Sequence, residues 1–300
     1  MKVLITGATG LIGSKITKLC LEKGWSVNYL TTNRSKIVNE RNYNGFYWNP
    51  KSNEIDVKCF QGVDAIFHLV GASVAQRWTD SYKKEILFSR IQTTKLLHQS
   101  IKNGKYAVKK IVSASAVGIY PSSLTNYYDE KNKDINPGFL GEVVHKWESE
   151  VDSFKSLNID VVKLRIGIVL SNNGGALPKM SQPVKYGVGS AFGSGEQWQS
   201  WIHINDLVAM FLYVLENNIS GIYNAVAPNP VTNEELIKAI AKQVKRPLIL
   251  PNIPKAIMQL ALGEMHIILF DSQRVCSKKI EKLGFEFSYN NLRPALEDLL

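Results

Sequence analysis

Three glycines near the start of the chain, Gly7, Gly10 and Gly13, have the spacing of a dinucleotide-binding turn. The apolar run that begins at Val3 predicts a strand before them, and an apolar-periodic helix follows them. In such a unit the glycines allow a tight turn and a close approach of backbone to a pyrophosphate, which the helix N-terminus attracts. The sequence therefore predicts a diphosphate site on the backbone of this turn, formed by Gly7, Thr9, Gly10, Leu11, Ile12 and Gly13.

The end of the second predicted strand, Ser26–Leu30, bears on which dinucleotide is bound. Many NAD-specific proteins carry a carboxylate here for the ribose 2′-hydroxyl. This chain has Thr32 and Arg34 instead, and a guanidinium can pair with a 2′-phosphate in a forked geometry. The pattern favours NADP(H) over NAD(H), the alternative being that Arg34 is an ordinary solvated residue of a βα loop.

Small and hydroxyl residues follow the next two predicted strands. Leu69 and Gly71 belong to a small-residue turn whose backbone can run beside the ribose and pyrophosphate. Ser113 is expected to contact the cofactor, and Ser115 to hydrogen-bond a reacting substrate oxygen unless it caps the following turn. His68 lies inside an apolar strand and is expected to be a core residue.

Further candidates come later in the chain. Arg165 and Gly167 follow the sixth strand, where backbone groups are expected to meet a nicotinamide carboxamide; a structural ion pair is equally open for Arg165. His203 is a candidate proton donor or ligand contact at the cleft mouth, unless it only bonds Asp206, the expected helix cap. Tyr120 is a candidate proton donor, with partly buried packing as the alternative.

A parallel sheet would bring these residues together. Strands are predicted at Val3–Thr6, Ser26–Leu30, Ala65–Leu69, Lys110–Ala114 and Val161–Leu164, with helical patterns between several of them and a short aromatic segment at Gly45–Asn49. We expect an α/β fold, a Rossmann-type doubly wound parallel sheet with a smaller mixed C-terminal substrate lobe. The expected division is a NAD(P)-binding Rossmann domain over residues 1–170 and an interleaved substrate lobe over residues 171–300, which includes one short strand near Ile222–Ala225.

Composition narrows the class of protein. The net charge is +10, but the basic residues are scattered singly or in pairs, so nucleic-acid binding is not expected. The three cysteines are far apart and lack metal-ligand spacing, which predicts reduced thiols and no metal site. No signal peptide and no apolar stretch of bilayer length is evident, so we expect a cytoplasmic monomer or homodimer that does not bind membranes.

Nine motifs along nearly the whole chain resemble the extended and atypical branches of the short-chain dehydrogenase/reductase superfamily. They are TGATGLIG at 6–13, HLVGA at 68–72, RW at 77–78, SRIQTT at 89–94, SASAVGIY at 113–120, GGALPKM at 174–180, WIHINDL at 201–207, APNPVTN at 227–233 and GEM at 263–265. The set is similar to the bacterial "epimerase family protein" group, related to NAD-dependent epimerases and dehydratases, with a C-terminal domain of unknown function. This resemblance implies a Rossmann domain that binds NADP(H) and a small substrate lobe.

The resemblance also implies a departure from the superfamily. Its enzymes usually carry a YxxxK pair in which the lysine lowers the pKa of the tyrosine that exchanges a proton. Aligning Trp147 and Glu148 with the usual pattern places Leu140 and Val144 at those two positions, and aliphatic side chains move no proton. Arg90 stands where an asparagine is usual, so its guanidinium is expected either to reach substrate or phosphate or to pair with Glu85 on the surface.

Two functions therefore stay open. The first is an NADP(H)-binding oxidoreductase or nucleotide-sugar-epimerase-like enzyme, acting on a sugar nucleotide or a small carbonyl compound. The second is a non-catalytic NADP(H)-binding redox sensor or scaffold, which the missing tyrosine and lysine favour.

Overall fold

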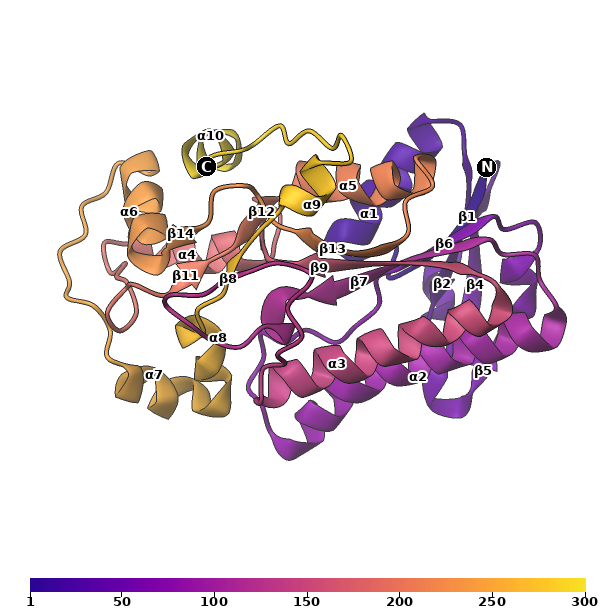
Figure 1. Cartoon of the computed structure of the whole chain (residues 1–300), viewed down its shortest axis with the longest axis horizontal. Coiled ribbons are helices and arrows are strands. Elements are labelled where there is room, and N and C mark those ends of the chain that lie inside the picture. The colour runs from indigo at the N-terminus through magenta and orange to yellow at the C-terminus, as the bar shows by residue number, and fades with distance from the viewer.

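The computed structural model describes residues 1–300 and has a nine-stranded sheet at its centre (Figure 1). Seven of the strands run parallel, in the spatial order β4 (Tyr43–Asn49), β2 (Ser26–Thr31), β1 (Lys2–Thr6), β6 (Ala65–His68), β7 (Lys110–Ala116), β9 (Asp160–Ile166) and β13 (Gly221–Ala225). The order reverses at β1, which pairs with both β2 and β6, and doubly wound sheets bind ligands at such a point. The predicted Rossmann-type sheet is confirmed.

Two details of the sheet differ from expectation. The aromatic segment near Gly45 forms a full strand, β4, flanked by the short antiparallel strands β3 (Asn39–Glu40) and β5 (Glu54–Ile55). The strand expected in the C-terminal lobe is β13, and it extends the main sheet by pairing parallel with β9. Three consecutive residues of this strand, Tyr223–Ala225, are buried, as is usual in a parallel sheet covered on both faces. The sequence pattern predicts the strand but not the sheet that it joins.

Four helices cover the two faces of the sheet (Figure 1). On one face lie α1 (Leu11–Glu22) and α5 (Ile204–Glu216), and on the other lie α2 (Asp80–Gly104) and α3 (Phe139–Asp152). The largest buried cluster combines side chains from both ends of the chain, from Val3 to Phe287. None of the helices is both long and apolar enough to cross a membrane.

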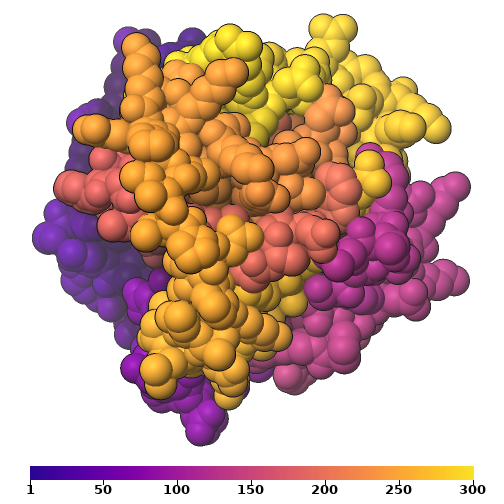
Figure 2. Space-filling model, turned by 90° about the vertical axis from the view of Figure 1, so that its left-hand side faces the viewer, coloured from indigo at the N-terminus to yellow at the C-terminus, as the bar shows by residue number.

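A second, smaller cluster of buried side chains lies at the other end of the molecule. It packs α4 (Ala176–Lys185), α6 (Asn233–Gln243) and α10 (Leu292–Leu299) against two small sheets. These sheets pair β10 (Ile168–Leu170) with β12 (Trp201–His203), and β11 (Trp198–Gln199) with β14 (Val231–Thr232). Figure 2 shows this end, where α7 (Lys255–Leu262) lies on the surface and buries none of its residues.

The C-terminal segment returns to the Rossmann sheet beyond α8 (Ile267–Phe270). Strand β15 (Arg274–Val275) pairs parallel with β8 (Tyr127–Tyr128), and α9 (Lys278–Glu281) follows it. Just before β15, Ser272 exchanges backbone and side-chain hydrogen bonds with the segment that follows β7: its amide donates to the Ser122 hydroxyl at 3.0 Å, and its hydroxyl donates to the Ser123 carbonyl at 2.7 Å. This junction fixes the residues around Ser272 beside the carboxyl ends of the central strands.

Candidate functional site

The glycine turn after β1 has the geometry of an anion-binding cradle. Gly7 has a φ of +72°, which favours glycine, and a Cβ on Gly13 would lie 2.2 Å from the Gly7 carbonyl oxygen. Helix α1 begins beyond Gly10 with no capping side chain and no acidic residue in its first turn. The amides of Leu11, Ile12 and Gly13 have no hydrogen-bond acceptor within the chain, so they are free to bind an anion.

The end of β2 carries no carboxylate. Thr32 is exposed, and Arg34 lies on the surface with its Cζ 3.7 Å from the centroid of the Tyr47 ring. Its Nη2 also reaches Oε1 of Glu54 at 3.4 Å, an exposed pair of small energetic weight. The side chain is therefore available to a ligand phosphate, and its assignment to a 2′-phosphate stays a prediction.

The end of β6 lies against the glycine turn. A Cβ on Gly7 would be 3.3 Å from the backbone of Leu69, whose amide donates to the Thr6 hydroxyl at 3.0 Å. His68 is fully buried, and its ring nitrogens contact the hydroxyls of Thr6 at 3.0 Å and Thr94 at 2.9 Å. Burial lowers its pKa to about 3, so His68 is a neutral core residue, in agreement with the sequence expectation.

A cavity of about 230 Å³ opens where β7 and β9 end. Its floor consists of the residues that follow these strands, its walls come from α2, α3 and the C-terminal segment, and most of the lining is apolar. The lining residues are Val74, Arg90, Ala116, Val117, Gly118, Leu140, Val143, Val144, Trp147, Ile166, Gly167, Ile168, Trp198, Gln199, Ser200, Ile268, Asp271 and Gln273. Among the residues that the sequence singled out for the site, Gly167 and Arg90 line this cavity.

The glycine turn is connected to the cavity by the segment Leu69–Gly71, which contacts Gly7 on one side and Arg90 on the other. A Cβ on Gly71, just beyond β6, would be 3.0 Å from the Cζ of Arg90, which lines the cavity. On the other side, a Cβ on Gly167 would lie 2.2 Å from the Ser200 carbonyl, so only glycine permits this close approach of backbone. The glycine turn and the cavity are thus consecutive parts of one edge of the sheet.

Asp271 is the only carboxyl group in the cavity wall. Burial raises its pKa, although hydrogen bonding to Asn136 and Gln273 and the charges of Lys255 and His266 oppose that rise. Asn136 also accepts a hydrogen bond from the Gly138 amide at the start of α3, which ties that helix to the same wall. Sequence reasoning missed Asp271, whose only local signal is a carboxylate directly after an apolar segment.

Ser115, Tyr120 and Arg165 meet in a buried network beside the cavity without lining it. Glu148 on α3 accepts from the Ser115 hydroxyl at 2.6 Å and from Nε and Nη2 of Arg165 at 2.8 and 2.9 Å. Nη1 of Arg165 donates to the Tyr120 hydroxyl at 3.0 Å, which in turn donates to the Asn224 side chain at 2.7 Å. The ion pair that the sequence left open for Arg165 is present.

Electrostatics matches this structural role. Burial alone would raise the pKa of Glu148, but Arg165, Ser115 and Lys163 lower it below its ordinary value. Burial raises the pKa of Tyr120 to about 12, which makes it a poor proton donor or acceptor at neutral pH. Ser113 is also fully buried, and its hydroxyl donates to the Ala114 carbonyl at 2.9 Å. Each of these hydroxyls donates to a partner within the chain. The catalytic and cofactor roles expected of these residues stay predictions.

His203 is the N-cap of α5 and lies outside the cavity wall. Its Nδ1 accepts from the Asn205 amide at 3.1 Å, so its Nε2 carries a proton and donates to Asp298 at 3.1 Å when the ring is neutral. The expected bond to Asp206 is absent: that carboxylate instead accepts from the amides of Ser288 and Tyr289, and it does not cap α5. Burial lowers the pKa of His203, and its role as proton donor stays a prediction.

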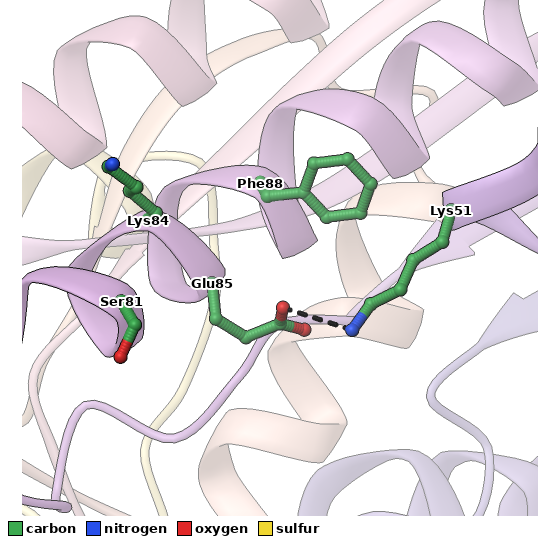
Figure 3. A pocket seen from close by; sticks show the side chains of 5 residues that line it. All are labelled: Lys51, Ser81, Lys84, Glu85 and Phe88. Atoms are coloured by element: carbon green, nitrogen blue, oxygen red, sulfur yellow. Dashed lines mark ion pairs between the residues drawn. The ribbon is translucent and has the colours of Figure 1, made fainter.

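Another hollow lies beside the first turns of α2 (Figure 3). Lys51, Ser81, Lys84, Glu85 and Phe88 line it, and Lys51 pairs with Glu85 at 3.3 Å. The surface pair that the sequence suggested between Arg90 and Glu85 is therefore wrong, because Glu85 turns toward Lys51.

The three cysteines are free and buried, and no group of three or more His, Cys, Asp and Glu side chains is placed to hold a metal ion.

Comparison with known proteins shows the family of this chain. Residues 3–225 match the NAD dependent epimerase/dehydratase family, and residues 253–299 match a domain of unknown function, DUF1731. An epimerase family protein of Staphylococcus aureus (strain MRSA252) is 38% identical over 298 residues, covering 99% of this chain and 98% of the relative. One from Staphylococcus haemolyticus is 37% identical over 302 residues, with the same coverage of 99% and 98%.

Solved structures extend the comparison. The human epimerase family protein SDR39U1 (isoform 2), solved with NADPH, has a TM-score of 0.85 and 29% identity, covering 100% of this chain and 99% of the human one. UDP-glucose 4-epimerase from Thermotoga maritima, solved with UDP-glucose, has a TM-score of 0.79 at 20% identity, covers 99% of this chain and 96% of that one, and shows the shared fold alone. The Rossmann-type sheet and both sequence matches lead to one assignment: this chain belongs to the NAD dependent epimerase/dehydratase family, as the "epimerase family protein" group within it.

Proposed function

We propose that this protein is an oxidoreductase or epimerase-like enzyme that prefers NADP(H) and converts a small carbonyl or hydroxyl compound. The observation that carries the proposal is the cavity of about 230 Å³ at the ends of β7 and β9. Ligands of doubly wound sheets react at such strand ends, and a largely apolar cavity with a few polar groups is typical of small-molecule sites. A sugar nucleotide is a second candidate substrate, since distant proteins of this fold are solved with UDP-glucose.

The glycine turn fits the cofactor. Free amides at Leu11, Ile12 and Gly13 suit the diphosphate, and the backbone at Leu69 and Gly71 suits the riboses. When bound, the cofactor supplies or accepts a hydride. Preference for NADP(H) is supported by the lack of a carboxylate after β2, by Thr32 and Arg34 at that place, and by NADPH in the human relative.

The division at residue 170 is part of the proposal. Residues 171–300 contribute a third of the cavity wall, namely Trp198, Gln199, Ser200, Ile268, Asp271 and Gln273. These residues lie on β11, its continuation and the segment around α8, which the bonds of Ser272 hold against the Rossmann sheet. We therefore assign the C-terminal half the task of covering the substrate and excluding water.

Asp271 is the proposed proton carrier. Leu140 and Val144, which stand at the positions of the usual tyrosine and lysine, line the cavity but carry no proton. Asp271 lines the same space, and burial raises its pKa, which favours the protonated form that can donate a proton. In reduction, its carboxyl proton goes to the substrate oxygen, and the carboxylate regains a proton from solvent when product leaves.

The test uses purified protein with NADPH and a panel of carbonyl compounds, following the loss of NADPH absorbance. We expect turnover by the wild type, a roughly 10²–10⁴-fold lower kcat for Asp271→Asn, and recovery of part of it in Asp271→Glu. NADPH affinity is expected to be unchanged in both variants. Equal kcat in the wild type and Asp271→Asn would exclude the proton role, and no turnover with the panel would favour the second function below.

The second candidate function is a non-catalytic redox sensor or scaffold that binds NADP(H). The aliphatic pair Leu140 and Val144 in the cavity wall is the observation that favours it. A sensor must bind oxidised and reduced cofactor with different affinities in order to respond to redox state. Titration calorimetry with NADP⁺ and NADPH, together with the turnover panel, separates the two functions.

A further inference from the structure

Arg90 is a cation in the cavity wall with no acidic partner. Its Nη1 donates to the carbonyl oxygens of Ala72 at 3.2 Å and Ile86 at 3.0 Å. No carboxylate lies within 4.0 Å of its guanidinium, and Glu85, earlier on α2, is paired with Lys51. Arginine presents five N–H donors, so the Nε and Nη2 groups of Arg90 are left without an acceptor in the chain.

The side chain is held in place rather than mobile on the surface. Its Cζ is 5.2 Å from the centroid of the Trp147 indole. The guanidinium also packs against Gly71, where an added Cβ would lie 3.0 Å from the Arg90 Cζ. Burial lowers the pKa of Arg90 to about 10, and only Tyr82 opposes this. The guanidinium therefore stays charged at neutral pH, in a setting where removal from water is not offset by a negative side chain.

The rest of the cavity does not supply the missing charge. Asp271 is its only carboxyl, and the charges that act on Asp271 are those of Lys255 and His266, not that of Arg90. Most of the remaining wall is apolar, with Val143, Trp147 and Ile268 among its members. A ligand that matches this lining has an anionic group for the free donors of Arg90 and an apolar body.

We propose that the cavity takes a carboxylate-bearing carbonyl or hydroxyl compound, of the 2-oxo or 2-hydroxy acid class, whose carboxylate binds Arg90. The planar guanidinium offers the N–H groups of Nε and Nη2 side by side, and this arrangement donates two parallel hydrogen bonds to a carboxylate. This inference rests on the proposed function and adds the substrate class to it. A phosphate group of the cofactor shares the same chemistry, so the experiment separates the two sources of the anion.

The experiment is calorimetric titration of phenylpyruvate into the protein saturated with NADP⁺, a state in which no hydride is available for turnover. Phenylacetone, which replaces the carboxylate with a methyl group, is the neutral match. We expect phenylpyruvate to bind the wild type at least tenfold more tightly than phenylacetone. Arg90→Met should weaken phenylpyruvate roughly ten- to hundredfold, as expected for a charged hydrogen bond, and leave phenylacetone unchanged.

Two further variants keep the result interpretable. Lys84→Met removes an exposed cation from the same helix and should leave phenylpyruvate binding unchanged, which separates direct contact from general attraction of anions. Arg90→Lys retains the charge and should recover part of the affinity for phenylpyruvate. This second variant keeps the test usable if Arg90→Met folds poorly.

Three outcomes would overturn the proposal: no heat from phenylpyruvate with the wild type, equal affinity for phenylacetone, or a loss in Arg90→Met that falls on NADP⁺ affinity alone. The last of these would assign the anion to the cofactor. None of them depends on turnover, so failure of the proposed enzyme activity is detected separately, by the NADPH absorbance panel.

Discussion

Glu148 on helix α3 and Arg165 on strand β9 form a bidentate ion pair, with nitrogen–oxygen distances of 2.8 and 2.9 Å. Both side chains are more than nine-tenths buried, and the Ser115 hydroxyl adds a third hydrogen bond to Glu148. Trp147, the residue before Glu148, lines the cavity. The pair therefore fixes the wall of the cavity through α3, although neither partner reaches the space inside it.

Glu148→Gln should destabilise the fold strongly. It leaves Arg165 without its buried counter-charge, and breaking such a pair from one side costs about 3–5 kcal/mol. Lys163 loses a contact at 3.8 Å but keeps its ion pair with Asp152 at 2.8 Å. Urea unfolding followed by circular dichroism measures the loss. Glu142→Gln, on the exposed face of the same helix, breaks only the surface pair with Lys146 and should change stability by less than about 1 kcal/mol. Equal effects of the two variants would contradict the structural role of Glu148.

Gly13→Ala should abolish tight cofactor binding. The added methyl group would lie 2.2 Å from the Gly7 carbonyl, so the turn and α1 must separate and the free amides lose their alignment. Titration calorimetry with NADPH measures the change in affinity. Lys18→Ala, on the exposed side of the same helix, is the matched control and should bind as the wild type does. Unchanged affinity in Gly13→Ala would place the diphosphate elsewhere.

Arg34→Ala should reduce the preference for NADPH over NADH. If Arg34 binds the 2′-phosphate, its loss weakens NADPH by roughly tenfold or more and leaves NADH unaffected. Dissociation constants for both cofactors, measured side by side, give the ratio. Arg41→Ala removes another exposed arginine nearby in sequence and should leave the ratio as it is. A parallel drop for both cofactors would mean that Arg34 does not read the 2′-phosphate.

Stability should fall as the pH drops below about 6.5, in part because of His68. Its pKa is about 3 in the folded protein and near 6.5 when unfolded, so the unfolded chain binds more protons between these values. Its contribution to stability is present above pH 6.5 and is lost progressively as the pH falls toward 3. At about 1.4 kcal/mol per pH unit, roughly 2 kcal/mol is lost by pH 5. Denaturant titrations from pH 7 to pH 5 should show a shallower slope in His68→Gln; the wild-type slope in that variant would refute the assignment.

Asp271→Asn should stabilise the protein at high pH. Because the folded pKa of Asp271 is raised above its unfolded value, its favourable contribution is present at low pH and is lost as the pH rises through the folded pKa. A neutral amide avoids that loss, so the melting temperature should exceed that of the wild type at pH 8 and match it at pH 4. Asp134→Asn, at an exposed position, should show no difference at either pH. A variant that is less stable at pH 8 would show that the Asp271 charge is compensated in the fold.

The first half of the site could be predicted because its signals are local. The Gly7 turn, the strand before it and the helix after it are consecutive in sequence, and alternation of strands with helices predicts a parallel sheet. His68 in an apolar strand is likewise a local pattern, and its burial agrees with it. The two matched family regions agree with the motif resemblance as well.

The other half depends on contacts between distant residues. Asp271 reaches the cavity because β15 pairs with β8 and because Ser272 bonds to residues some 150 positions earlier, and no periodicity encodes that pairing. Glu85 and Arg90 are five residues apart on α2 and so lie on different sides of the helix, Glu85 toward Lys51 and Arg90 toward the cavity. Ser115 lies on β7 and is expected from the sequence to face a substrate, but its hydroxyl donates to Glu148 on α3, 33 residues later in the chain.

We expect the cofactor's reactive ring to lie at the cavity that Arg90 and Asp271 line. A crystal structure of the protein with NADP⁺ and phenylpyruvate tests it most directly. The diphosphate should lie on the amides of Leu11, Ile12 and Gly13, and the nicotinamide should face the cavity. The carbonyl oxygen of phenylpyruvate should lie within hydrogen-bonding distance of Asp271. A nicotinamide ring outside the cavity, or a diphosphate away from the start of α1, would contradict it.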